Sequence, residues 1–299
     1  MSDYRADPAD IRATFDRVLG EVRPKLHRYC ARMTGSAIDG EDVVQDALVK
    51  ALEAIPQLQL IAQIEGWLFR IAHNAALDFL RRRGRRDATF SDEDVTMAID
   101  PVSVVDDRQV AAASLRTFMR LPVAQRSSVI LKDVLGYSLE EIGGVIEASL
   151  PAVKAALHRG RAQLREFARE PEDVAPPALA QGERARLDTY IARFNARDFD
   201  AIRNMLADDV RLDLVARKRS QGRIEVGSYF HNYGRVHDWR MVAGTVDGRA
   251  AALVLDPEDP QGRPTYFVVL DWTGEKLALI RDFRYARYAL DGAEIRALG

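Results

Sequence analysis

A helix predicted over residues 65–83 gathers polar side chains that can contact nucleic acid. Residues three or four apart share one side of a helix, and the outward set here is Arg70, Asn74, Asp78, Arg81 and Arg82. Arginine and asparagine donate hydrogen bonds to phosphates and base edges, and an aromatic residue such as Trp67 can stack on an unpaired base. The alternative is structural, with Asp78 and Arg82 forming an ion pair and Trp67 packing in a core.

A second candidate surface lies in residues 136–166. Ser138 followed by Glu141 fits a capping box at a helix start. After a tight turn at Glu147-Ala148, Ser149 can cap a further helix. Two short helices with a tight turn predict a helix-turn-helix. Its second helix carries the outward polar residues Ser149, Lys154, His158 and Arg161. The alternative is a plain helical hairpin with a solvated basic face.

Residues 41–55 form a third amphipathic segment. The apolar positions expected to face a core are Val44, Leu48, Ala51, Leu52 and Ile55. The polar positions, expected mostly on the other side, are Glu41, Asp42, Gln45, Asp46 and Glu53. Acidic residues in a first helical turn are also favoured by the helix dipole, so a solvated acidic turn is an equally simple interpretation.

Bulk composition limits the function classes. The 299 residues carry a net charge of −2, so bulk non-specific nucleic-acid binding is not expected. Charge is nevertheless ordered along the chain: a basic run at 81–86, an acidic stretch at 87–107 and a second basic run at 154–169. The one cysteine, Cys30, excludes an intramolecular disulfide. We expect no metal, no cofactor, no membrane span, no secretory leader and a cytoplasmic location.

The chain is predicted to be multidomain. Residues 10–86 are helical in pattern, 87–110 read as an acidic linker, 111–170 are helical again, and 171–182 form a Pro/Ala linker before a domain at 183–299. In that last domain, one or two helices at about 184–207 precede short apolar runs. The predicted strands are Val210–Val215, Trp239–Val246, Ala250–Leu255, Thr265–Trp272 and Leu277–Tyr288, with a further helix around Ile224–Tyr233. Asp247-Gly248 is a strong hairpin signal, and the order predicts an α+β fold.

Two motifs resemble the sigma-70 family, in its extracytoplasmic-function group (group 4). EDVVQDALVKAL followed by WLFRIAHNAALDFLRRRGRR resembles sigma region 2. The resemblance implies that Asp42, Gln45 and Asp46 dock on the clamp helices of the polymerase β′ subunit. It also implies that the −10 promoter element is engaged by Trp67, Arg70, Asn74, Asp78, Arg81 and Arg82, with capture of a flipped base. His73 receives no role.

Residues 115–164 resemble sigma region 4 through Leu121-Pro122, Arg126, Gly136, Ser138 and Glu141-Ile142, followed by Ser149, Val153-Lys154 and Arg161-Ala162. This implies that Ser149, Lys154, His158 and Arg161 read the −35 element and that the module touches the polymerase β flap. Gly143-Gly144 departs from the family pattern, and each glycine weakens a helix by about 1 kcal/mol.

The C-terminal residues resemble SnoaL-like domains of the nuclear-transport-factor superfamily, which are curved sheets wrapped by helices. Candidate acid–base residues by type are Asp213, Tyr229, His231, Asp271 and Asp282, but catalysis needs them to converge. The aromatic residues that can line a pocket or, more simply, pack a core are Tyr266, Phe267, Trp272, Phe283 and Tyr285. No catalytic residue is therefore predicted, and the resemblance implies regulation in cis through a small ligand or an intramolecular partner.

The sequence thus predicts a sigma factor, not an enzyme. It would direct core RNA polymerase to promoter DNA and initiate transcription, with the C-terminal domain tuning that activity. The alternative is a SnoaL-like enzyme or small-molecule receptor fused to a DNA-binding regulator; the region 2 motif argues against it.

Overall fold

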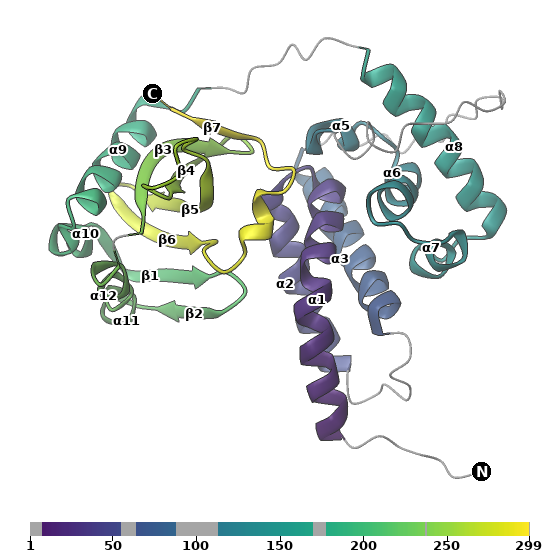
Figure 1. Ribbon diagram of the computed structural model, residues 1–299, viewed down its shortest axis with the longest axis horizontal. Helices are drawn as coiled ribbons and strands as arrows, with labels where there is room; N and C mark the ends of the chain where they lie inside the picture. The colour runs from purple at the N-terminus through teal and green to yellow at the C-terminus, as the bar shows by residue number, and fades with distance from the viewer. Residues whose placement is uncertain (1–7, 55–63, 88–112, 170–177, 237, 299) are drawn as a thin grey trace. The chain divides into compact units, whose positions relative to one another are not determined.

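The computed structural model (Figure 1) describes residues 8–54, 64–87, 113–169, 178–236 and 238–298. The chain divides into two compact units, Met1–Glu172 and Asp173–Gly299. The first is helical in its described residues, and the second combines helices with a seven-stranded sheet. The predicted fold class, helical modules followed by an α+β domain, is confirmed. Most of the predicted acidic linker lies outside the described residues.

Three long helices open the first unit: α1 (Pro8–Thr34), α2 (Ala37–Ala54) and α3 (Ile64–Asp87). They pack on one another, and α1 and α2 approach closely at Gly40, where a Cβ atom would lie 2.5 Å from the Ala31 nitrogen. Only glycine fits such a contact without a backbone shift. Cys30 is buried in this core, as a small apolar residue would be.

Helix α2 differs from its sequence prediction in three places. It begins at Ala37, four residues before the predicted start. Glu41, expected on the polar side, is fully buried and forms an ion pair with Arg23 at 2.5 Å. Leu52, expected in the core, is 38% exposed, and Ile55 lies outside the described residues. The partner that makes burial of Glu41 tolerable sits on another helix, so the helical period alone could not reveal it.

The second helical group contains α5 (Leu115–Met119), α6 (Val123–Val129), the π-helical turn η3 (Ile130–Val134), α7 (Leu139–Ile146) and α8 (Leu150–Phe167). The predicted capping box is present: the Ser138 side chain accepts from the Glu141 nitrogen, and the Glu141 side chain accepts from the Ser138 nitrogen. Gly136 ends η3 at φ +79°, a conformation that favours glycine.

The turn between α7 and α8 explains why one of the two glycines that depart from the family pattern, Gly143, is present. Glu147 sits at φ 54°, and the Ala148 nitrogen donates to the Gly143 carbonyl. A Cβ atom on Gly143 would lie 2.9 Å from the Ala148 oxygen, whereas one on Gly144 would meet nothing within 4 Å. Gly143 therefore permits the tight turn, while Gly144 only loosens the helix.

The second unit is built on a sheet with strand order β2-β1-β6-β5-β4-β3-β7. Its strands are β1 (Leu206–Leu214), β2 (Lys218–Gln221), β3 (Arg240–Val246), β4 (Arg249–Leu255), β5 (Pro264–Thr273), β6 (Lys276–Asp282) and β7 (Ile295–Ala297). β1 and β6 pair in parallel, and the other neighbours pair antiparallel.

Helices cover this sheet. They are α9 (Gln181–Asn195), α10 (Phe199–Met205), α11 (Arg223–Gly227), α12 (Tyr229–Gly234) and the short turn η4 (Arg287–Leu290). Helix α9 packs against β3 and β4 (Figure 1). Phe194 of α9 makes edge contacts with Tyr233 and Trp239, so aromatic packing joins α9 to α12 and to the start of β3.

All five predicted strands are present, with shifted ends. The Asp247-Gly248 hairpin is confirmed, since both residues have positive φ, 51° and 79°. The last strand was predicted to continue to Tyr288 but stops at Asp282, whose carboxylate accepts from the Arg284 nitrogen at 2.8 Å and turns the chain. β2 and β7 were not predicted, because strands of four and three residues are too short to show a clear alternation of apolar and polar residues. Tyr285, a core candidate, is 45% exposed.

Candidate nucleic-acid interface

Helix α3 presents the predicted polar face to solvent. Arg70, Asn74, Asp78, Arg81 and Arg82 are all exposed, while Leu68, Ala72 and Ala75 are buried on the other side. Trp67 is half-buried and packs against the core, so its ring is partly structural and partly available. The five polar residues thus form one continuous surface along α3, which we name the α3 face.

Weak ion pairs organise the α3 face. Asp78 accepts from Lys50 of α2 and from Arg81, each at 3.4 Å. Arg82 reaches Asp46 of α2 at 3.5 Å. All these side chains are about half-exposed or more, and exposed pairs contribute about 0–1 kcal/mol. The arginines can therefore exchange these carboxylates for phosphates at little cost.

The predicted polymerase-docking residues lie on α2. Asp46 is exposed, and Asp42 and Gln45 are half-buried. Gln45 donates to Glu41 at 3.1 Å, and Glu41 in turn binds Arg23 of α1. The buried Glu41–Arg23 pair, which sequence reasoning missed, therefore fixes the side chain of Gln45 from below.

Helix α8 carries the second predicted surface. Ser149 caps it by accepting from the Ala152 nitrogen, and Lys154 is exposed. His158 is half-buried. The inward positions Val153, Leu157 and Leu164 are buried as expected. The exposed first turns of α8 thus combine the partial positive charge of a helix start with a lysine.

Arg161 has a different environment. Its Nε donates to Asp133 Oδ2 of η3 at 2.9 Å, and its Nη2 contacts Oδ1 of the same carboxylate. The Asp133 side chain is 1% exposed and the Arg161 side chain 30%. This two-point pair ties α8 to η3, so the guanidinium is oriented toward the protein.

A buried histidine lies beneath the α3 face. His73 Nδ1 and the Tyr29 hydroxyl share a hydrogen bond of 2.7 Å. Burial lowers the pKa of His73 from 6.5 to about 4, so the ring is neutral at physiological pH. His73 therefore acts as a hydrogen-bonded core residue between α1 and α3.

Two family models match the chain: "Sigma-70 region 2" over residues 19–86 and "Sigma-70, region 4" over residues 115–164. The ECF RNA polymerase sigma factor SigM of Mycobacterium tuberculosis is 33% identical over 159 residues, covering 53% of this chain and 79% of SigM. The chain belongs to the ECF sigma factor family. As a sigma factor it is a non-enzymatic initiation subunit whose regions 2 and 4 bind core RNA polymerase and promoter DNA.

One further likeness, to SigG, extends beyond these regions, and another is to a solved structure. SigG of Mycobacterium tuberculosis is 28% identical over 307 residues, covering 93% of this chain and 83% of SigG. The solved structure of an NTF2-like protein of unknown function from Cytophaga hutchinsonii is 12% identical, with a TM-score of 0.27, over 34% of this chain and 97% of that protein.

In the C-terminal unit, two of the five acid–base candidates meet. The fully buried Asp282 accepts from the hydroxyls of Tyr229 at 2.8 Å and Tyr233 at 2.7 Å, and Tyr233 contacts the Tyr266 hydroxyl at 3.0 Å. Burial raises the pKa of Asp282, although the tyrosine donors act against the shift. The other three candidates are elsewhere: Asp213 pairs with arginines, and His231 and Asp271 are exposed.

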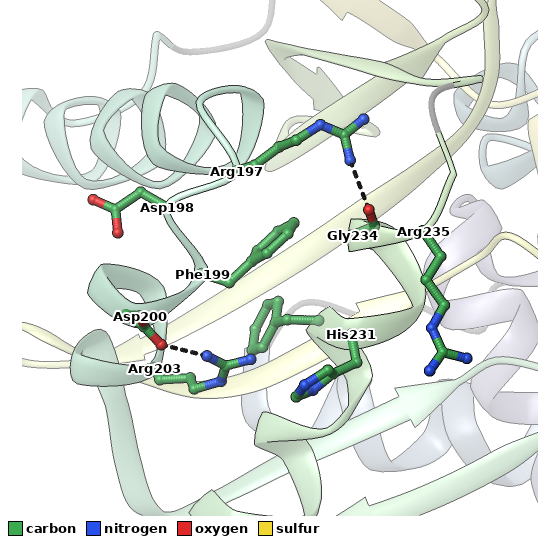
Figure 2. Close-up of a pocket in the computed structure, with 9 residues that line it drawn as sticks. Arg197, Asp198, Phe199, Asp200, Arg203, His231, Gly234 and Arg235 are labelled. Carbon is green, nitrogen blue, oxygen red and sulfur yellow. Dashed lines mark hydrogen bonds and ion pairs between the residues drawn. The ribbon is translucent and has the colours of Figure 1, made fainter.

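A shallow cavity of about 390 Å³ lies at the surface beside α10 and α12 (Figure 2). Phe199 and Phe230 stack in its wall, 6.0 Å between ring centroids. Arg197 donates to the backbone oxygens of Tyr233 and Val236, at 3.1 and 2.9 Å. That arginine therefore supports the end of α12 instead of pointing to a ligand.

Within the described residues, no helix is long and apolar enough to cross a membrane. Nor do histidine, cysteine and acidic side chains gather there in groups of three or more that could hold a metal ion.

Proposed function

We propose that the α3 face engages the −10 element and that the first turns of α8 read the −35 element. What supports this is one feature common to both surfaces: donors stand exposed on a helix whose opposite side is buried. Arg70 and Asn74 are exposed on α3, and Lys154 is exposed on α8, which Ser149 caps. The exposed α2 residue Asp46, with Asp42 and Gln45, is proposed to dock on the β′ clamp helices, and region 4 on the β flap.

Within the −35 set, Arg161 is proposed to be a positioning residue. Its pairing with buried Asp133 orients α8 on η3, whereas Ser149 and Lys154 are exposed and His158 is half-buried. This divides the four predicted residues into three contacts and one support.

Transcription in vitro with core RNA polymerase tests the assignment. Arg70→Ala combined with Asn74→Ala should reduce promoter-dependent transcripts at least tenfold, since each lost base contact costs about 1–3 kcal/mol. The matched control is Arg17→Ala, another exposed arginine, on α1 and outside the proposed surface. Equal loss in both variants, or loss in neither, would contradict the role of the α3 face.

We also propose that the C-terminal unit regulates the sigma activity in cis and performs no chemistry. Support comes from its own hydrophobic core and from the position of Asp213, His231 and Asp271, which lie away from the buried Tyr229–Asp282 pair. Transcription by the full chain should differ from that of residues 1–180, which end before α9 and retain the first compact unit. Equal activity of the two would contradict cis regulation. With polymerase and promoter as partners, the proposed site of action is the cytoplasm.

A second candidate for the C-terminal unit is a small-molecule receptor. One observation favours it: in the described part of the chain, the buried Tyr190 hydroxyl and Trp239 Nε1 lack a hydrogen-bond partner, although such groups are usually satisfied. Asp282 acts electrostatically on Tyr190. Native mass spectrometry of the freshly purified full chain tests this candidate. Detection of only the mass of the protein without a bound molecule would count against it.

A further inference from the structure

The first turn of α8 exposes apolar side chains. Leu150, Pro151 and Ala152 follow the Ser149 cap, and all three are exposed. Leu150 is 39% exposed, and within the described residues 113–169 no other large apolar side chain is exposed. A single apolar residue at a surface is ordinary, but three in succession at the start of the proposed recognition helix form a patch. We name Leu150, Pro151 and Ala152 the α8 tip.

Local contacts hold the α8 tip in a defined conformation. The Ser149 backbone is extended, and its carbonyl accepts from the Val153 nitrogen at 3.0 Å. Val153 is fully buried and anchors the first turn in the core. Proline in the first turn adds to this rigidity, because its fixed φ already suits a helix start. The three exposed side chains therefore project from a helix and not from a loop.

The α8 tip offers few hydrogen-bond donors. Pro151 has no N–H group, and the Ala152 N–H group donates to the Ser149 hydroxyl at 3.4 Å. Helix starts commonly bind phosphate through such N–H groups. Here one of these groups is absent and another is already bonded, so apolar contact is the main interaction that the tip can make.

Leu150 begins a row of side chains that continues with Lys154 and His158. These residues are spaced by four, so they lie along one side of α8. Lys154 is exposed and cationic, which suits a polyanionic partner such as DNA. In helix-turn-helix proteins, the N-terminal residues of the recognition helix contact base edges. Leu150 therefore occupies the end of the row that would approach the bases.

The major groove of DNA contains one apolar group that such a side chain can recognise. Every A·T pair presents the thymine C5-methyl group there, whereas a G·C pair presents hydrogen-bonding groups. Leucine has no donor or acceptor in its side chain, so it distinguishes base pairs only by burying this methyl group. Burial of one such group changes an equilibrium constant about fourfold.

We propose that Leu150 is a specificity-determining residue, which selects an A·T pair in the −35 element by contacting its thymine methyl group. The proposal rests on the proposed function, because it names a chemical group that the same surface of α8 reads. It adds an apolar contact to the polar contacts assigned to Ser149, Lys154 and His158.

Holoenzyme made from the full chain and core RNA polymerase tests the proposal. The holoenzyme first selects promoters from a library with a randomised −35 region. Each selected thymine is then replaced by deoxyuridine, which lacks only the C5-methyl group, and at one position the affinity should fall about fourfold. A −35 preference without any effect of deoxyuridine would overturn the role of Leu150 alone. The absence of any −35 preference would overturn the proposed function as well.

Variants assign the effect to the side chain. Leu150→Ser, which is short and polar, should abolish the preference for thymine over deoxyuridine, and Leu150→Met should keep it. Lys154→Ala should weaken binding to both bases equally. The matched control, Ile224→Ala, changes an apolar residue of the C-terminal unit that is 94% exposed and should leave the preference unchanged.

Circular dichroism confirms that Leu150→Ser is folded. A thymine preference that survives in the folded variant would overturn the proposal. So would weaker binding of this variant to core polymerase with the thymine preference intact, because Leu150 would then contact the polymerase and not the DNA.

Discussion

Replacing Arg161 with alanine should weaken the packing of α8 on η3. It should leave unchanged the number of contacts that the protein makes with DNA phosphates. The substitution removes both donors from Asp133, whose side chain is 1% exposed. Leaving a buried charge without its partner costs about 3–5 kcal/mol. Because the Arg161 side chain is 30% exposed, water can reach the pair, so we expect the lower end, about 3 kcal/mol.

Two measurements separate a supporting role from a DNA-contacting role. Amide hydrogen exchange of α8 peptides, followed by mass spectrometry, reports local opening, and about 3 kcal/mol corresponds to exchange faster by roughly 100-fold. The salt dependence of binding to a −35 duplex reports phosphate contacts, since each lost contact lowers the slope by about 0.9. Arg161→Ala should speed the hydrogen exchange of α8 and leave the salt dependence of binding unchanged. The control, Lys154→Ala, should do the reverse.

Asp133→Ala provides the reciprocal check. It removes the buried carboxylate and should also speed α8 exchange, because Arg161 loses its anchor on η3. If Arg161→Ala instead lowers the salt slope by about one contact while α8 exchange stays at the wild-type rate, the assignment of Arg161 as a positioning residue is refuted.

Three further predictions concern stability. Gly144→Ala should raise the free energy of unfolding by about 0.4–1 kcal/mol in urea titrations, whereas Gly143→Ala should lower it, because its Cβ atom meets the Ala148 oxygen; equal effects would refute the turn argument. For His73, the folded pKa of about 4 lies below the ordinary 6.5. As pH falls, His73 therefore takes up a proton in the unfolded chain before it does so in the folded chain. The free energy of unfolding drops between pH 6.5 and 4 by at most about 3 kcal/mol. His73→Asn should make this dependence on pH smaller. Tyr229→Phe removes a donor to a buried carboxyl group and should destabilise the C-terminal unit by about 1–3 kcal/mol, measured by tryptophan emission.

Short-range signals in the sequence were sufficient to predict much of the fold. The Ser138–Glu141 capping box, the Ser149 cap and the Asp247-Gly248 hairpin all formed where the sequence predicted them. Each depends on atoms within a few residues of one another, so neighbouring residue types decide the outcome. The exposed polar set on α3 is predictable for the same reason, since the helical period separates it from the buried set.

What the sequence by itself determined is therefore the order of elements, the family motifs and the faces that carry polar residues. Only the tertiary structure decided which charged side chains are held by partners within the protein. Glu41 is buried because Arg23 reaches it from another helix, and Arg161 is held by Asp133, 28 residues away. Arg126 binds the Met33 carbonyl 93 residues away. Burial of a charge is stable only when a partner arrives, and a partner from another helix has no periodic signal in the chain.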